Sequence, residues 1–239
     1  MRPCSLWLAI LALVAAVACG SSKPLAPDAG AVDAPADAPA DAPAADAATC
    51  PRTLLTGGTE IGAQGWTIVM APPAVLSYGP DYVQLQTSSA ASTSGQLLLS
   101  YLGAVDPGKP FTLQVVMLVE AVTAHNQLDS AAAILGSFTP PAGDRDERNE
   151  MIYLDPTKIG WADSTLSSPG FPFTVTDGGY HTYELSVDAS GAATVRVDGT
   201  QALTRNGFTT NGTIAVGDQT NDPGIDSTLR IRSVTRLCQ

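Results

Sequence analysis

The sequence predicts an all-β fold, a two-sheet antiparallel β-sandwich or jelly roll. Three observations lead to this prediction. After residue 50, apolar and polar residues alternate in short runs, which is the period of a half-buried strand. Gly, Pro and Asp turn signals separate these runs at regular intervals, and no segment shows the apolar period of an amphipathic helix. Many short strands with such turns bury one core between two sheets.

Three consecutive strands are the clearest part of this pattern. In the run 180–188, the apolar side chains of Tyr183, Leu185 and Val187 lie on one face and polar side chains lie on the other. Turn residues at 188–191 lead into a second alternating run at 193–197. Asp198-Gly199 then predicts a two-residue type I′ hairpin into a strand at 200–203, which completes a three-strand meander.

The other predicted strands are shorter or less regular. The run 111–121 is apolar on both faces, so we expect it in the centre of its sheet. The remaining strands are predicted at 65–70, 81–86, 96–102, 130–138, 149–155, 158–162, 213–217 and 227–236.

Residues 1–49 are predicted to lie outside the folded core. Residues 1–18 read as a signal peptide, with Arg2 followed by an apolar stretch that is too short to span a bilayer. Residues 19–49 contain the repeat DAPADAPADAPA and have little apolar surface to bury, so we expect an extended linker. The folded region is therefore 50–239.

The signal junction carries a resemblance of its own. Ala16-Val17-Ala18-Cys19-Gly20 resembles the lipobox of bacterial lipoproteins, which implies that Cys19 carries the lipid. Ordinary secretion after an Ala-x-Ala-like site is the alternative. The Asp-Ala-Pro linker resembles those of myxobacterial surface lipoproteins. These resemblances imply a protein held at the bacterial outer membrane by its lipid alone, periplasmic or surface-exposed.

Two cysteines remain in the folded region, at its first residue and near its last. Cys50 and Cys238 lie in a chain expected to reach an oxidising compartment, and the termini of a domain often lie close together. We therefore predict a Cys50–Cys238 disulfide. Metal ligation is the weaker alternative, because the sequence has neither a CxxC spacing nor a nearby His.

Composition argues against nucleic acid as a partner. The 239 residues contain 12 Lys and Arg against 23 Asp and Glu, which gives a net charge of -11. Basic residues are not interleaved with aromatic ones anywhere in the chain, so nothing in it would neutralise a phosphate backbone.

The C-terminal third resembles a known family. The segments DGGYHTYELSVDASGAATVRVDGTQAL and NGTIAVGDQTNDPGIDSTLRIRSV are similar to concanavalin A-like lectin/glucanase domains of the laminin G type. The resemblance covers about residues 175–236 and implies a sandwich of that kind, while 50–174 agrees only in the rhythm of its strands. Its motifs are structural, so it implies the fold more than the function.

The sequence assigns no catalytic residue. The Glu-x-Asp-x-x-Glu strand of the family's glycosidases is absent, and the acids Glu150 and Asp155 are spaced to face opposite sides of a strand. His181 is interpreted as structural rather than as a general base. No Gly-x-Ser-x-Gly, phosphate-loop or His-Glu-x-x-His motif occurs.

Sugar recognition needs an aromatic ring beside polar groups, and one predicted hairpin offers both. Tyr153, Asp155, Trp161 and Asp163 are the candidate ligand-binding residues; the alternative is that Tyr153 and Trp161 belong to the core.

The stretch DQTNDPGID supplies oxygen ligands that suit calcium: Asp218, Asp222 and Asp226. The resemblance also implies calcium near such loops. Acidic turn residues without a metal are the alternative interpretation.

The first hypothesis is a lipid-anchored, non-catalytic lectin-like domain that binds a glycan or a surface protein. The second is a glycan-cleaving enzyme of the same fold, a glycoside hydrolase or lyase. The third is a purely structural envelope protein.

Overall fold

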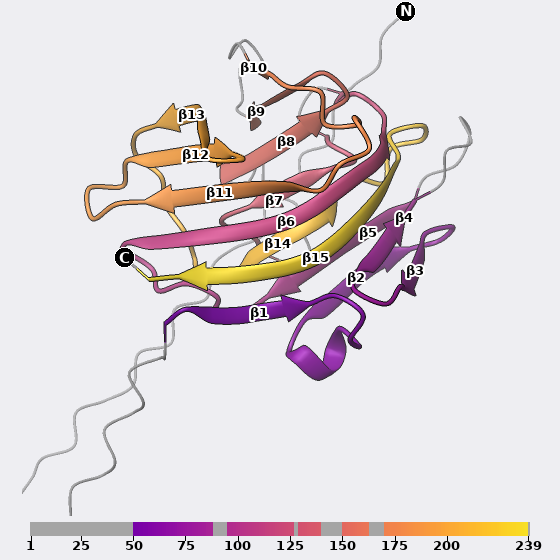
Figure 1. The fold of residues 1–239 in the computed structure, drawn as a ribbon, viewed down its shortest axis with the longest axis horizontal. Helices are drawn as coiled ribbons and strands as arrows, with labels where there is room; N and C mark the ends of the chain where they lie inside the picture. Colours follow the sequence, from indigo (N-terminus) through magenta and orange to yellow (C-terminus); the bar gives the residue numbers. More distant parts are fainter. Residues whose placement is uncertain (1–49, 88–94, 127–128, 140–149, 163–169, 239) are drawn as a thin grey trace, which may run out of the picture. The chain divides into compact units, whose positions relative to one another are not determined.

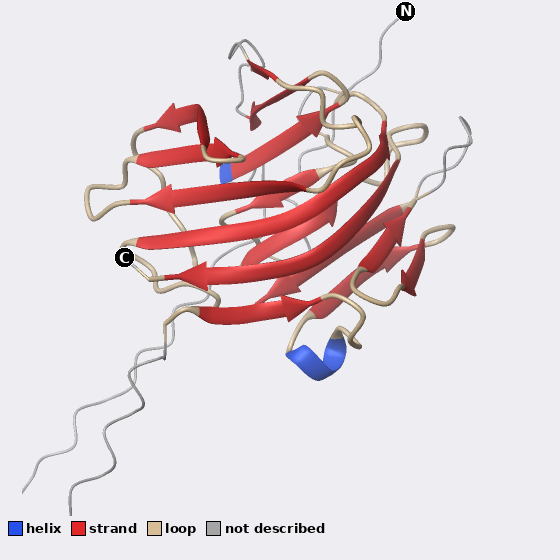
Figure 2. Ribbon diagram, viewed as in Figure 1, coloured by secondary structure: helices blue, strands red, loops and turns tan. Residues whose placement is uncertain are grey.

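The computed structural model describes residues 50–87, 95–126, 129–139, 150–162 and 170–238, and they form two packed antiparallel sheets (Figure 1; Figure 2). Sheet A has eight strands in the order β13-β12-β11-β6-β15-β4-β3, with β1 also paired to β15. Its strands are β1 (Arg52–Thr56), β3 (Val75–Tyr78), β4 (Val83–Gln86), β6 (Phe111–Val122), β11 (His181–Val187), β12 (Ala193–Val197), β13 (Thr200–Arg205) and β15 (Ser227–Leu237).

Sheet B has seven strands in the order β10-β9-β8-β7-β14-β5-β2. Its strands are β2 (Thr67–Ala71), β5 (Gln96–Tyr101), β7 (Ala133–Leu135), β8 (Met151–Asp155), β9 (Lys158–Ala162), β10 (Phe171–Pro172) and β14 (Ile214–Asp218). Among the described residues the 3-10 turn η1 (Gly62–Gln64) is the named helical element, and no described helix is long and apolar enough to span a membrane.

The predicted sandwich is confirmed, and so are its most regular parts. Strand β6 lies between β11 and β15, in the interior of sheet A, as its two apolar faces predict. The β12–β13 hairpin turns at Asp198 and Gly199, whose φ angles of 50° and 79° are those that a type I′ turn requires. Strands β1, β3 and β10 were not predicted from the sequence. β3 follows Pro72-Pro73 and β10 contains Pro172, and proline weakens any strand signal.

The two sheets differ in how they bury their side chains. In β11 the inward residues are buried and the outward ones are half-buried, as in an alternating strand. In β8 and β14 of sheet B every residue is buried. The main core between the sheets contains Leu97, Ile134, Ile152 and Val216. The residues that alternate with them along the same strands point to the outer face of sheet B and form a second apolar cluster, which includes Leu98, Ala133, Leu135, Met151, Tyr153 and Ala215.

The predicted disulfide is also confirmed. Cys50 and Cys238 are bonded, with their Cα atoms 5.2 Å apart. The strands beside them hold the two ends of the described chain together, because Arg52 of β1 pairs with Arg236 of β15.

Candidate functional site

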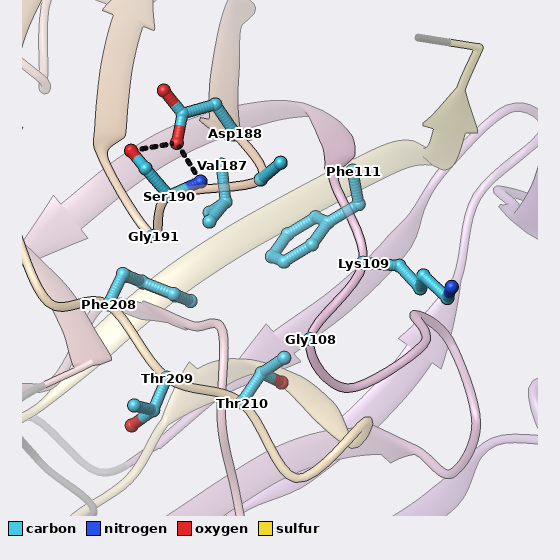
Figure 3. A pocket seen from close by; sticks show the side chains of 11 residues that line it. Gly108, Lys109, Phe111, Val187, Asp188, Ser190, Gly191, Phe208, Thr209 and Thr210 are labelled. Atoms are coloured by element: carbon cyan, nitrogen blue, oxygen red, sulfur yellow. Dashed lines mark hydrogen bonds between the residues drawn. The ribbon is translucent and has the colours of Figure 1, made fainter.

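A pocket of about 310 Å³ opens at one end of the sandwich, where β6 begins and β11 ends. We call this the pocket end. The side chains of Phe111 and Phe208 point into the pocket from different segments, as Figure 3 shows. The pocket is otherwise lined by Val187, Ala189 and Gly191 and by the polar residues Lys109, Asp188, Ser190, Thr209 and Thr210. An apolar floor beneath a polar rim is the usual construction of a small-molecule site.

The rim is built by the turn between β11 and β12. The Oδ1 atom of Asp188 accepts hydrogen bonds from the Ser190 N–H at 2.8 Å, the Ser190 hydroxyl at 2.7 Å and the Ala192 N–H at 3.0 Å. Gly191 has a φ of 78°, which closes the turn. These hydrogen bonds lower the pKa of Asp188, so an ionised carboxylate stands at the rim at neutral pH.

The opposite wall is the segment between β13 and β14. The Phe208 N–H donates to the Gly191 carbonyl at 3.0 Å, and the Thr210 hydroxyl donates to the Gly136 carbonyl at 2.6 Å. The Phe208 ring lies 6.1 Å from the ring of Phe111 and 6.1 Å from that of Trp161. The pocket floor is therefore the outermost layer of an aromatic cluster that continues into the core.

Beneath this wall lies a buried charged group. Glu150 accepts hydrogen bonds from the Thr209 N–H at 3.1 Å and hydroxyl at 3.4 Å, and its Oε2 lies 3.9 Å from Nη1 of Arg205. The Arg205 guanidinium stacks over the Trp161 ring at 5.0 Å. Burial raises the pKa of Glu150, against the opposing effects of the Thr209 N–H and the Arg205 charge.

Three polar atoms of this group are buried and have no hydrogen-bond partner in the described structure: Oε2 of Glu150, Nη1 of Arg205 and Nε1 of Trp161. Oε2 and Nη1 are too far apart for a direct hydrogen bond and interact as an ion pair.

The structure places the three described residues of the predicted sugar site on two different faces of sheet B. Trp161 pairs with Ile152 and faces the main core, 5% exposed. Tyr153 and Asp155 face the other way, on the outer face of sheet B, and both are buried. Asp163 lies outside the described residues. Trp161 therefore supports the pocket floor from beneath, and Tyr153 does not share its surface.

The outer-face residues form a compact cluster with His125. Asp155 accepts from the His125 N–H at 2.8 Å and lies 2.6 Å from the ring Nδ1. The His125 ring stacks on the Tyr153 ring with centroids 4.1 Å apart. The Nζ atom of Lys158 lies 5.7 Å from the centroid of the Tyr153 ring. Tyr153 also packs so closely over Gly160 that any side chain at position 160 would collide with it. This packing leaves no open ring face on Tyr153 for a sugar.

The predicted calcium residues come together only in part. Asp218 and Asp226 are both buried at the opposite end of β6, beside Thr87 and Ser227, and we call this the acid end. Asp222 is partly exposed in the loop between them. The two Asp218 oxygens accept from the Thr87 hydroxyl at 2.8 Å and the Thr220 N–H at 3.1 Å. In the described part of the chain, no three acidic, His or Cys side chains gather in a way that could hold a metal.

Burial raises the pKa of Asp218 to about 8, and the charge of Asp226 adds to the rise. The hydrogen bonds from Thr87 and Thr220 oppose this rise without cancelling it. A cavity of about 150 Å³ lies next to the pair and is lined in part by Asp226 and Thr123. The described residues bring two of the three predicted ligands together as buried acids, and calcium stays a prediction.

His181, interpreted from the sequence as structural, lies between two carboxylates at the start of β11. Its Nδ1 lies 2.7 Å from Asp198 and its Nε2 lies 2.9 Å from Asp177, so carboxylates occupy both ring nitrogens. Asp198 also accepts from the Thr182 N–H at 2.9 Å, which ties the histidine to the start of β11. Through its two ring nitrogens, His181 links the turn that contains Asp177 to the turn that contains Asp198.

Sequence reasoning missed most of the pocket. Phe111 and Phe208 carry no motif. Phe111 begins β6 and Phe208 follows β13, and the strand order β13-β12-β11-β6 of sheet A brings the two segments to the same pocket. The one available signal was local, because the sequence does identify the turn at 188–191 that forms the rim.

Comparisons with known proteins bear on the fold. No family model matches the sequence, and no curated protein matches it. Among solved structures, the chain is similar to the carbohydrate esterase vb_24B_21 from the Shiga toxin-encoding bacteriophage phi24B, with a TM-score of 0.54 and 16% identity over 79% of this chain and 100% of that one. The fold is a lectin-like β-sandwich.

Two further structures have the same architecture. One is the exoplasmic/lumenal domain of VIP36 in its Ca2+/Man-bound form, with a TM-score of 0.51 and 13% identity over 77% of this chain and 88% of that one. The other is the cellulose induced protein Cip1, with a TM-score of 0.50 and 10% identity over 73% of this chain and 89% of that one. At such low identities the likeness is one of fold alone.

Proposed function

We propose that this protein is a non-catalytic glycan-binding domain and that the pocket between Phe111 and Phe208 holds a sugar. The observation that carries the proposal is the pocket itself, with two aromatic rings in its floor and an ionised carboxylate at its rim. The apolar face of a pyranose packs against aromatic carbon, while its hydroxyls require polar partners such as Asp188, Ser190 and Thr210.

The size of the pocket limits the ligand. A volume of about 310 Å³ is at the lower end of the range for ligand sites, which suits a single sugar ring or the end of a chain. The rim is held in place by the hydrogen bonds of the Asp188 turn, so little ordering is needed on binding. The carbohydrate-related proteins that share the fold add support by analogy.

A binding assay tests this proposal. The full chain is passed over a panel of immobilised polysaccharides, and retention is measured for the wild type and for Ala189→Trp, which fills the pocket from an exposed position. We expect wild-type retention on at least one glycan and its loss in Ala189→Trp. Ala63→Trp, at an equally exposed position in η1, is the matched control and should be retained like the wild type.

Retention that survives Ala189→Trp would place the site elsewhere. Absence of retention on every glycan would favour a protein partner or a purely structural envelope role.

We also propose that the domain is displayed on a lipid anchor at Cys19 through the linker 19–49, at the bacterial outer membrane. Support comes from the lipobox-like sequence and the Asp-Ala-Pro repeat. Labelled palmitate should be incorporated by the wild type and not by Cys19→Ser, and the labelled protein should fractionate with outer membranes. Release of unlabelled wild-type protein into the medium would contradict this.

A hydrolase is the second candidate, and the His125–Asp155 pair favours it. A carboxylate that holds Nδ1 of a histidine orients the other ring nitrogen as a general base, which is the arrangement found in catalytic triads. No described side chain makes a hydrogen bond to Nε2 of His125 as a nucleophile would. Incubation with acetylated and plain polysaccharides, followed by assays for acetate and reducing ends, tests this candidate. Product that disappears in His125→Asn would support it.

A further inference from the structure

Asn-Gly occurs twice in the chain, and both copies lie in the segment between β13 and β14 that forms one wall of the pocket. They are Asn206-Gly207 and Asn211-Gly212, and both asparagines are exposed. The side-chain amide of an asparagine can be attacked by the backbone nitrogen of the next residue, and glycine hinders this attack least because it has no side chain. Sequence and exposure alone therefore do not distinguish the two pairs.

Hydrogen bonds hold the second pair. Asn211 donates from its side-chain nitrogen to the Phe138 carbonyl at 3.0 Å and accepts at Oδ1 from the Thr213 N–H at 3.0 Å. The N–H of Gly212, whose nitrogen would be the nucleophile, donates to the Thr210 hydroxyl at 3.1 Å. The amide and the nucleophile are thus held by separate partners, and these hydrogen bonds must break before the two groups can react.

The first pair is not held in this way. Among the described residues, no hydrogen bond involves the Asn206 side chain or the Gly207 N–H. Gly207 has a φ of 72°, and a Cβ added there would meet no atom within 4 Å, so packing does not oppose a change in its backbone. Packing resumes at Phe208, which is 6% exposed and donates its N–H to the Gly191 carbonyl at 3.0 Å.

We propose that Asn206-Gly207 is a site of spontaneous deamidation and that the reaction remodels the pocket wall. The Gly207 nitrogen loses its proton and attacks Cγ of Asn206, the bond from Cγ to the side-chain nitrogen breaks, and ammonia leaves with that proton. Water then opens the resulting cyclic succinimide. Opening at the side-chain carbonyl gives aspartate, and opening at the main-chain carbonyl gives isoaspartate, in which the chain runs through the former side chain.

Isoaspartate would change the backbone two residues before the pocket floor. It adds a methylene group to the main chain between positions 206 and 207, together with a negative charge. The Phe208 ring lies 6.1 Å from the Phe111 ring, and the Phe208 N–H is bonded to Gly191. A longer chain just before Phe208 displaces that ring contact or breaks that hydrogen bond. The effect on ligand binding rests on the proposed sugar pocket, whereas the modification itself does not.

Peptide mapping tests the modification. Trypsin cuts after Arg205 and Arg230, so a single peptide, 206–230, carries both Asn-Gly pairs. The full chain is aged at neutral pH, and fragment ions locate the mass gain against an unaged sample digested in parallel. Deamidation at Asn206 should be about tenfold or more faster than at Asn211, because only Asn211 must first lose its hydrogen bonds.

Unfolding supplies the control for this comparison. In urea, with the disulfide reduced, the two rates should become similar, because both asparagines are then free and both precede glycine. Equal rates in the folded chain, or a ratio that persists in urea, would overturn the proposal.

Two readouts test the remodelling. On a glycan that retains the fresh wild type, the aged wild type should lose retention in step with its isoaspartate content, which is measured by separating the isomeric peptides. Tryptophan emission reads the displacement without a ligand, since the Phe208 ring lies 6.1 Å from that of Trp161. Both should change on ageing in the wild type and not in Asn206→Gln, whose longer side chain cyclises far more slowly.

The variant Asn206→Asp, measured fresh, separates charge from chain length. It carries the added charge without the extra main-chain atom, and it should behave like the fresh wild type. Unchanged retention and emission in wild type that contains isoaspartate would overturn the remodelling. If no glycan retains the fresh wild type, the sugar pocket is wrong, and the peptide map and the emission still decide this proposal.

Discussion

The two ends of the sandwich bury acidic side chains in different surroundings. At the pocket end, Glu150 has the Arg205 guanidinium beside it and hydrogen bonds from Thr209. At the acid end, Asp218 also has hydrogen-bond donors, but the nearby charge is that of another acid, Asp226. Burial raises the pKa of both groups, to about 8 in the case of Asp218. Burial is the largest cause of the rise at both ends, and the neighbouring charge adds to it at the acid end and opposes it at the pocket end.

This difference bears on the proposed function, because the proposed sugar pocket lies at the end where the buried acid faces a positive charge. The pocket end keeps its charge compensated and opens a rim to solvent, as a binding site needs. The acid end takes up a proton in the folded state and thereby ties stability to pH.

The largest effect is expected for Asp218→Asn. Because the pKa of Asp218 is about 8 in the folded protein and near 3.8 when unfolded, the folded state holds an extra proton between these values. The wild type therefore loses stability as the pH rises from about 4 to about 8, by on the order of 5 kcal/mol. Asn cannot ionise, so the variant should show a flatter profile in urea unfolding at pH 5, 6.5 and 8.

Asp188→Asn is the matched control, since Asp188 is exposed and its pKa is lowered rather than raised. In Asp188→Asn, the unfolding free energy should change between pH 5 and pH 8 as it does in the wild type. Equal slopes in the wild type and Asp218→Asn would show that the acid end does not hold the proton. A gain in stability from added Ca2+ at pH 8, lost in Asp218→Asn, would show instead that calcium occupies this end.

A smaller effect is expected when the pocket end is made to resemble the acid end. Arg205→Met keeps much of the packing over Trp161 and removes the charge that faces Glu150. We expect a loss of about 2 kcal/mol in unfolding free energy at pH 8, because an uncompensated buried carboxylate remains. The loss should be smaller at pH 5, where Glu150 is more easily protonated.

The double variant Glu150→Gln/Arg205→Met separates charge from packing. If charge dominates, it should recover most of the stability that Arg205→Met loses at pH 8. A loss that is the same at pH 5 and pH 8 and is not recovered would assign the effect of Arg205 to packing alone.

The sequence predicted those parts of the fold that depend on local pattern. The alternation in β11 and β12 and the turn at Asp198-Gly199 are properties of neighbouring residues, and the structure confirms them. The Cys50–Cys238 disulfide followed from a simple count of cysteines. The pocket could not be predicted in this way, because its floor joins Phe111 and Phe208 from distant segments through the strand order of sheet A.

In the hairpin β8–β9, the pairing register determines which side chains share a face of the sheet. Its turn spans only 156 and 157, so Asp155 pairs with Lys158 and Tyr153 with Gly160. This register puts Trp161 on the face opposite to Tyr153, since side chains alternate along a strand. A two-residue turn was readable from the sequence, but which face would be packed against sheet A depended on the rest of the fold.

The smallest effect is expected at His181. Its contribution to stability falls as the pH rises, as does that of Asp218, so the two contributions must be measured apart. Burial alone would lower the pKa of His181, but Asp198 and Asp177 outweigh burial and raise it. The stabilisation is therefore complete below about pH 6.5 and is lost as the pH rises through the folded-state pKa. His181→Gln should cost about 1 kcal/mol at pH 5.5 and less at pH 8.5, since both carboxylates are half-exposed and screened. Thermal unfolding in the Asp218→Asn background isolates this contribution, and an equal loss at both pH values would show that the histidine acts by packing against Phe173 rather than by charge.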